Sequence, residues 1–118
     1  MIIAVDFDGT LAVDAYPNIG EPRWEVIDFV KARKECGDTI ILWTCRGGTV
    51  LQKAVEWARV HGIKFDYVNE NCPKRNALYG GDSRKISADV YIDDRGINPH
   101  LAKSIVATFT AARIKLAV

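Results

Sequence analysis

Short apolar runs alternate along this chain with segments of helical periodicity, and that alternation limits the folds open to it. Runs of strand length occupy residues 2–7 (IIAVDF), 39–44 (TIILWT), 64–68 (KFDYV) and 88–93 (ADVYID), and helical spacing of apolar residues marks 23–37 and 49–62. Parallel strands need crossover connections, and helices of this length supply them. The sequence therefore predicts an α/β protein, a three-layer Rossmann-like fold with a central parallel sheet.

Length and composition are those of one soluble globular domain over residues 1–118. The chain is 48% hydrophobic and 26% charged, and its net charge of +1 gives no electrostatic reason to expect a nucleic-acid or membrane surface. No apolar run approaches the roughly 20 residues of a membrane span. Three cysteines without close pairing suit reduced thiols, so we expect a cytoplasmic protein, with Cys45 packed and inert.

Two further segments carry weaker patterns. Residues 69–84 are polar and rich in turn-forming residues, so they are predicted to form a loop. Residues 98–118 fit either a helix or an edge strand, and helix is favoured. The three tryptophans stand at apolar-face positions and are expected in the core: Trp24, Trp43 and Trp57.

Charged and hydroxyl side chains stand where the predicted strands end. In open α/β sheets ligands bind outside the carboxyl ends of the strands, so these residues are the candidates for a site. They are Asp6 and Asp8 after the first strand, Thr44 and Arg46 after the second, and Asp93 and Asp94 after the last, with Lys85 just before that last strand.

This set of side chains favours a hard cation and a phosphoryl group. Four carboxylates in one cleft repel one another unless a cation lies among them. An all-oxygen site suits Mg2+, which is typically held by one or two carboxylates together with water and substrate phosphate. A metal ion, a lysine and a hydroxyl around one point would bind a phosphoryl group.

The ordered motifs resemble those of the haloacid dehalogenase superfamily, in its Mg2+-dependent phosphatase branch. VDFDGTL is similar to the first family motif, IILWT to the second, Lys85 to the third and VYIDD to the fourth. The four occur in the family's order and bracket residues 2 to 94. The resemblance implies a phosphomonoester hydrolase.

The resemblance also implies a role for each matching residue. Asp6 would be the nucleophile that forms an aspartyl-phosphate, and Asp8 the general acid and base, with its backbone carbonyl on the metal. Thr44 and Lys85 would bind phosphoryl oxygens, with Lys74 as the competing lysine. Asp6 would also bind the metal, and Asp94, or else Asp93, would complete the metal ligands.

Arg46 lies just beyond the second motif and has two interpretations. It could bind the transferred phosphate or a second anionic group of the substrate. Alternatively, it is a surface arginine paired with an acid.

The spacing of the motifs leaves no room for a cap domain. Residues 12–23 hold only a short excursion with turn residues, so the chain resembles the capless branch of the family. Cover for an open site would come from the substrate, from the 69–84 segment or from a second copy of the chain. The expected partner is a phosphorylated small molecule or polymer end, with no membrane. Two alternatives stay open: a polynucleotide-end phosphatase, and a non-catalytic phosphate- or partner-binding module of the same fold.

Overall fold

A four-stranded parallel sheet forms the centre of the protein in a computed structural model that describes residues 1–101. Its strands are β1 (Ile2–Val5), β4 (Thr39–Leu42), β5 (Tyr67–Val68) and β6 (Val90–Ile92), in the order β5-β4-β1-β6. The helices are α1 (Trp24–Glu35), α2 (Gly48–Val60) and α3 (Pro73–Tyr79), followed by a short 3-10 turn, η1 (Pro99–Leu101). The predicted Rossmann-like α/β fold with a parallel sheet is confirmed, and residues 1–101 contain no cap domain.

The main core lies between one face of the sheet and the helices α1 and α2. Alternate residues of β1 and β4 point into it, because side chains along a strand alternate between the two faces. The fully buried members from these four elements are Ile3, Val5, Ile40, Leu42, Ile27, Val30, Ala54 and Ala58. A smaller cluster around Ala4, Ile41 and Ile86 occupies the other face.

The strand order places a topological switch between β1 and β6. The chain moves outward from β1 to β4 and β5, then returns to pair β6 with the opposite side of β1. At such a switch point the connections leave in opposite directions and open a crevice at the carboxyl ends of the strands. Asp6 follows β1 and Asp93 follows β6, so both stand at that crevice.

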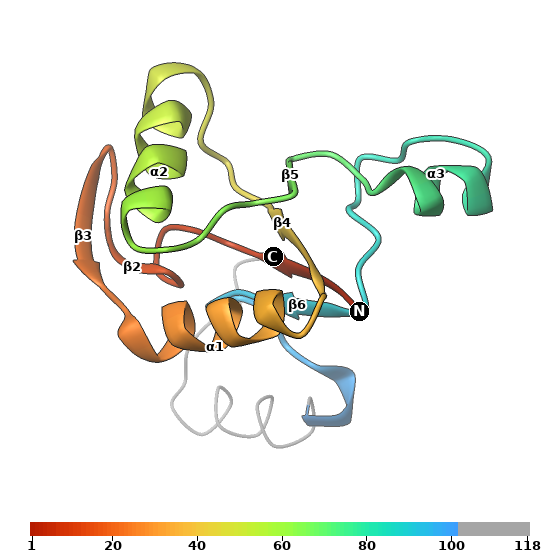
Figure 1. Cartoon of the computed structure of the whole chain (residues 1–118), viewed down its shortest axis with the longest axis horizontal. Coiled ribbons are helices and arrows are strands. Elements are labelled where there is room, and N and C mark those ends of the chain that lie inside the picture. The colour runs from red at the N-terminus through yellow and green to blue at the C-terminus, as the bar shows by residue number, and fades with distance from the viewer. Residues whose placement is uncertain (102–118) are drawn as a thin grey trace, which may run out of the picture.

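The excursion at 12–23 is an antiparallel hairpin rather than turns alone. Strands β2 (Ala12–Ala15) and β3 (Asn18–Pro22) pair beside the sheet, at the end of the molecule opposite α3 (Figure 1). Ile19 packs against the main core, whereas residues 13–18 are exposed. The turn residues of this segment were recognisable, but its two short strands lack the alternation of buried and exposed apolar residues.

The loop predicted over 69–84 was wrong in part, because α3 forms within it. Pro73 stands in the first turn, where its missing N–H costs nothing, and Gly80 ends the helix with a φ of 74°. Helix α3 buries none of its residues, so it has no apolar stripe to reveal it in the sequence. The uncertain assignment of 98–118 falls, from residue 102 on, outside the described residues.

Three expectations of burial were wrong. Trp24 is 50% exposed and Trp43 is 36% exposed, while Trp57 packs against the core as expected. Cys45 is also exposed, because it lies beyond the carboxyl end of β4, where the sheet is open. All three cysteines are free thiols.

None of the helices within residues 1–101 combines the length and the apolar character needed to cross a membrane.

Candidate functional site

A buried phenylalanine aims the two N-terminal aspartates out of the sheet. Phe7 is fully buried and its ring meets Trp57 edge to face at 5.4 Å. The Phe7 carbonyl accepts hydrogen bonds from the N–H groups of Thr10 at 3.1 Å and Leu11 at 2.9 Å, so the chain turns tightly after it. Because Phe7 points into the core, Asp6 and Asp8 on either side of it lie at the surface of the crevice.

The carboxylate of Asp94 reaches this turn from the neighbouring strand. It lies so close to Gly9 that a β-carbon there would stand 2.3 Å from Asp94 Oδ2. Asp93 is oriented differently, since its Oδ1 accepts the backbone N–H groups of Arg95 at 2.8 Å and Gly96 at 2.5 Å. Of the two adjacent acids, Asp94 therefore faces the turn after β1, and Asp93 stabilises its own loop.

The gathered carboxylates act on the ionisation of Asp6. Burial raises the pKa of Asp6 above its ordinary value, and the negative charges of Asp94, Asp8 and Asp93 raise it further. A hydrogen bond from the Phe7 N–H to Asp6 Oδ1, at 2.8 Å, opposes this increase. Asp6 and Asp94 have no cationic partner among residues 1–101, as neither forms a salt bridge there.

Thr44 is held at the end of β4 by a side chain from the end of β5. The Thr44 N–H donates to Asn69 Oδ1 at 2.8 Å, and Asn69 Nδ2 donates back to the Thr44 carbonyl at 3.0 Å. Asn69 adopts a φ of 53°, which brings its amide across to the neighbouring strand. The Thr44 hydroxyl accepts the N–H of Arg46 at 3.1 Å. Asn69 stood at a predicted strand end, but nothing in the sequence marked this pairing.

Arg46 is a buried residue rather than a surface one, and it lies in the wall of the cavity beside Asp8. Its side chain is 1% exposed and forms a bidentate pair with Asp8, in which Nε and Nη2 donate to the two carboxylate oxygens at 2.8 Å each. The Asp8 carboxylate raises the pKa of Arg46 above its ordinary value, while burial opposes this. The pairing interpretation therefore fits Arg46 better than the substrate-binding one, although the partner lies inside the site.

A cavity of about 390 Å³ opens over these residues. Its lining includes Asp6, Asp8 and Thr44, the hairpin residues Asp14 and Tyr16, and Arg95 from the loop after β6. Arg95 also lines an adjoining cavity of about 260 Å³ that again includes Asp6. Within residues 1–101 the Arg95 side chain forms no ion pair or hydrogen bond. Arg95 stands two residues after the predicted strand at 88–93, and nothing in the sequence pointed to a role for it.

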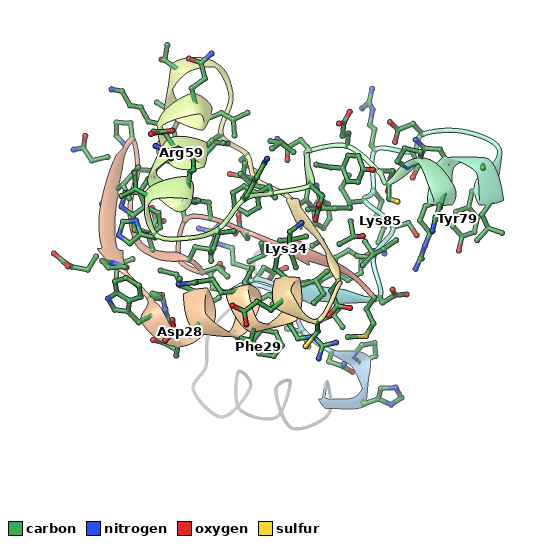
Figure 2. The ribbon with its side chains drawn as sticks, viewed as in Figure 1. Asp28, Phe29, Lys34, Arg59, Tyr79 and Lys85 are labelled. Carbon is green, nitrogen blue, oxygen red and sulfur yellow. The ribbon has the colours of Figure 1, made fainter. Side chains whose placement is uncertain are left out.

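The two candidate lysines lie outside this cavity. Lys85 is exposed (Figure 2), and its Nζ lies 5.7 Å from the centre of the Tyr91 ring. It lines a different cavity, together with Trp43 and Asp93. Lys74 is on α3, and the next residue of that helix, Arg75, forms an ion pair with Asp89 at 2.6 Å. Asp89 in turn accepts the N–H of Ile2 at the start of β1. Helix α3 is therefore attached near the amino ends of the strands, whereas the crevice lies at their carboxyl ends. Of the two lysines, Lys85 is the better placed.

The donors at the crevice suit a hard divalent cation. No group of three or more His, Cys, Asp or Glu side chains within residues 1–101 is arranged to hold a metal by itself. The carboxylates of Asp6 and Asp94 lie close enough for the charge of Asp94 to raise the pKa of Asp6, and both side chains offer only oxygen donors. This matches Mg2+, which takes few protein ligands and keeps water and phosphate as the rest.

Comparison with known proteins gives one strong match. No protein-family model matches the chain, and no curated protein matches it. A solved structure of a conserved protein from Bacteroides thetaiotaomicron superposes with a TM-score of 0.72 at 36% sequence identity, over 96% of this chain and 91% of that one. Identity at this level over nearly the whole of both chains shows common descent as well as a common fold. The chain belongs to the same protein family as this conserved Bacteroides thetaiotaomicron protein.

Proposed function

We propose that the protein is a Mg2+-dependent phosphomonoester hydrolase that works through an aspartyl-phosphate on Asp6. The observation that best supports this is the approach of Asp94 to the turn after β1, which gathers acids from two strands at the topological switch point. Like charges gathered in this way raise one another's pKa unless a cation lies among them, and such clusters are typical of functional sites. The motif resemblance described above agrees with the proposal.

The proposed reaction has two displacements at phosphorus. An Asp6 carboxylate oxygen forms a bond to phosphorus as the bond to the leaving oxygen breaks, and Asp8 gives that oxygen a proton. Asp8 then takes a proton from water, whose oxygen attacks the phosphorus and releases phosphate from Asp6. Mg2+, held by Asp6 and Asp94, would supply charge neutralisation at the phosphoryl oxygens.

The other predicted residues keep proposed roles in binding. Thr44 lines the cavity and would donate its hydroxyl to a phosphoryl oxygen. Lys85 would have to swing from the Tyr91 ring to reach the phosphate, which a long, exposed side chain can do. Arg95 would meet an anionic group of the substrate, in place of Arg46.

A non-catalytic phosphate-binding module of the same fold is the second candidate. The observation in its favour is the Asp8–Arg46 pair, because both oxygens of the proposed acid already accept hydrogen bonds. A general acid must carry a proton on one of those oxygens. Each carboxylate oxygen has two lone pairs, and Arg46 uses one on each oxygen of Asp8. Catalysis therefore requires that a remaining lone pair of Asp8 point into the cavity, where it can carry the proton.

Hydrolysis of p-nitrophenyl phosphate tests the first candidate against the second. We expect slow release of nitrophenol that requires Mg2+, is abolished by EDTA and by Asp6→Asn, and falls by about 10²–10⁴-fold in Asp8→Asn. Asp28→Asn, an exposed acid on α1 (Figure 2), is the matched control and should retain full activity. Activity that survives EDTA or the Asp6 substitution would reject the mechanism. Phosphate binding without hydrolysis would favour the binding module.

A substrate panel would then separate small molecules from polymer ends. Hydrolysis of 3′-phosphorylated oligonucleotides in preference to phosphorylated metabolites would identify a polynucleotide-end phosphatase.

The three free thiols support the expectation of a reducing, cytoplasmic setting. A second copy of the chain covering the open cavity would appear as a dimer whose formation raises activity.

A further inference from the structure

Every N–H group of the Arg46 guanidinium has an acceptor in the protein. Besides the pair with Asp8, Nη2 donates to the Asn18 carbonyl at 2.8 Å, and Nη1 donates to the carbonyls of Pro17 and Val50 at 3.2 Å each. A guanidinium has five N–H groups in a rigid planar fork, and all five are used here. Arg46 therefore joins three segments: the turn after β1, the start of α2 and the tip of the β2–β3 hairpin.

Two aromatic rings enclose this buried charge. The guanidinium carbon lies 5.0 Å from the centre of the Phe7 ring and 5.2 Å from that of Tyr16. Phe7 belongs to the core, whereas Tyr16 is 59% exposed at the tip of the hairpin. Rings at these distances exclude water from the cation and strengthen its bonds to Asp8.

The tip of the hairpin has few other attachments. Within residues 1–101, the side-chain hydrogen bonds that reach residues 16–18 from outside the hairpin all come from Arg46. The same tip carries Tyr16, and Asp14 lies beside it on β2. Both residues line the cavity above Asp6 and Asp8. A movement of the tip would remove two acceptors from Arg46 and disturb its hold on Asp8.

We propose that Arg46 is a positioning residue, which holds the Asp8 carboxylate and the Tyr16–Asn18 turn in one fixed arrangement so that the seating of the hairpin sets the orientation of Asp8. The proposal rests on the proposed function for the role of Asp8. It assigns Arg46 no contact with the substrate. It also makes the hairpin tip, which a substrate in the cavity would touch, part of the machinery that orients the acid.

Steady-state kinetics of Arg46→Gln and a double-mutant cycle with Asp8→Asn test the positioning role. We expect kcat to fall about 10²-fold with KM changed less than about 3-fold, the size of effect that a small misplacement of a catalytic group produces. In the Asp8→Asn background the same substitution should change kcat by less than about 3-fold, since Arg46 acts through Asp8. Equal losses in both backgrounds, or a loss confined to KM, would overturn the proposal.

Hydrogen–deuterium exchange tests the link to the hairpin without any substrate. The amides of residues 15, 16, 18 and 19 should exchange at least about 10-fold faster in Arg46→Gln, while those of β1 and β4 stay protected. Unchanged exchange at the tip would overturn the proposal. Because this measurement needs no turnover, it decides the Arg46 assignment even if the wild-type protein hydrolyses no phosphoester, a result that would reject the proposed function instead.

Control variants separate the guanidinium from its surroundings. Arg59→Gln, which breaks an exposed arginine–glutamate pair on α2 (Figure 2), should behave as wild type in both experiments. Should Arg46→Gln fail to fold, Arg46→Lys keeps the charge but not the fork and should still lower kcat at least about 10-fold. Wild-type kinetics and exchange in Arg46→Lys would show that charge alone suffices, which contradicts the proposal.

Discussion

The Asp94 carboxylate, just beyond β6, fills the space that a side chain at Gly9 would need in the turn after β1. A β-carbon at Gly9 would lie 2.3 Å from Asp94 Oδ2, and Gly9 has a φ of 81°. The glycine therefore serves two purposes. It permits the left-handed backbone of the turn, and it leaves room for the acid from β6.

Gly9→Ala should remove the metal-dependent activity together with some stability. The methyl group displaces Asp94, and an alanine at positive φ costs about 1–2 kcal/mol. We expect a lower Tm and at least a tenfold loss of Mg2+-dependent turnover. Gly37→Ala is the matched control, because Gly37 has a φ of 90° with nothing within 4 Å of the added carbon. Thermal melts and rates that are the same for the two variants would contradict the role of the contact.

Asp6→Asn should stabilise the metal-free protein. Burial, and then the charges of its acidic neighbours, raise the pKa of Asp6 above the ordinary 3.8. An acid whose pKa is raised on folding binds its proton more tightly in the native state, so stability falls as pH rises from 3.8 through the raised value. Replacing it with an uncharged amide should raise Tm near neutral pH by ~2–4 °C, as about 0.5 kcal/mol does in a domain of this size.

Mg2+ should reverse that pH dependence in the wild-type protein. The cation binds the ionised carboxylate, so the increase in Tm on adding Mg2+ should grow as pH rises through the raised pKa of Asp6. Melting curves over a pH series, with and without Mg2+, measure it. Asp6→Asn should lose most of the increase. A Mg2+ effect that is equal in the two proteins would place the metal elsewhere.

Asn69→Ala should loosen Thr44. The substitution removes two hydrogen bonds to the Thr44 backbone, each with a net value of about 0.5–1.5 kcal/mol, and also strains the positive φ of residue 69. We expect a loss of about 1–3 kcal/mol in the free energy of unfolding and weaker phosphate binding. Asn69→Gly also loses the two hydrogen bonds, but glycine adopts the positive φ without strain. A denaturant titration of both variants therefore separates the cost of the hydrogen bonds from the cost of the backbone strain. A fully wild-type Asn69→Gly would show that the amide is dispensable.

Alkylation of Cys45 should report on occupancy of the site. Cys45 is exposed and lines both cavities that contain Asp6. Iodoacetamide should modify it, and orthovanadate with Mg2+ should slow that reaction several-fold. Cys36, exposed after α1, serves as the internal control and should react at the same rate throughout. Protection of both thiols, or of neither, on peptide mass mapping would argue against a phosphate site beside Cys45.

The sequence predicted the sheet well because its strands are short apolar runs that pack on one core. It also placed Asp6, Asp8, Thr44 and Asp94 at one edge, since the carboxyl ends of parallel strands share an edge. Helix α3 escaped prediction because it buries no apolar face. The hairpin escaped for the same reason, as residues 13–18 are exposed.

The contacts of Arg46 could not be predicted from the sequence. The guanidinium binds Asp8, 38 positions away, and two backbone carbonyls of a turn, and carbonyls carry no residue-type signal. The exposure of Trp43 was missed because its position in an apolar run resembles that of its buried neighbours. In each case the deciding fact was a long-range arrangement, while the residue type was compatible with either outcome.

Borohydride trapping of the reacting enzyme tests the central claim most directly. Reduction of an aspartyl-phosphate converts that aspartate to homoserine, which peptide sequencing by mass spectrometry locates. Wild-type protein quenched during turnover with p-nitrophenyl phosphate and Mg2+ should carry homoserine at position 6, and none when substrate or Mg2+ is omitted. Turnover with an unmodified Asp6, or with the label at another residue, would contradict the account.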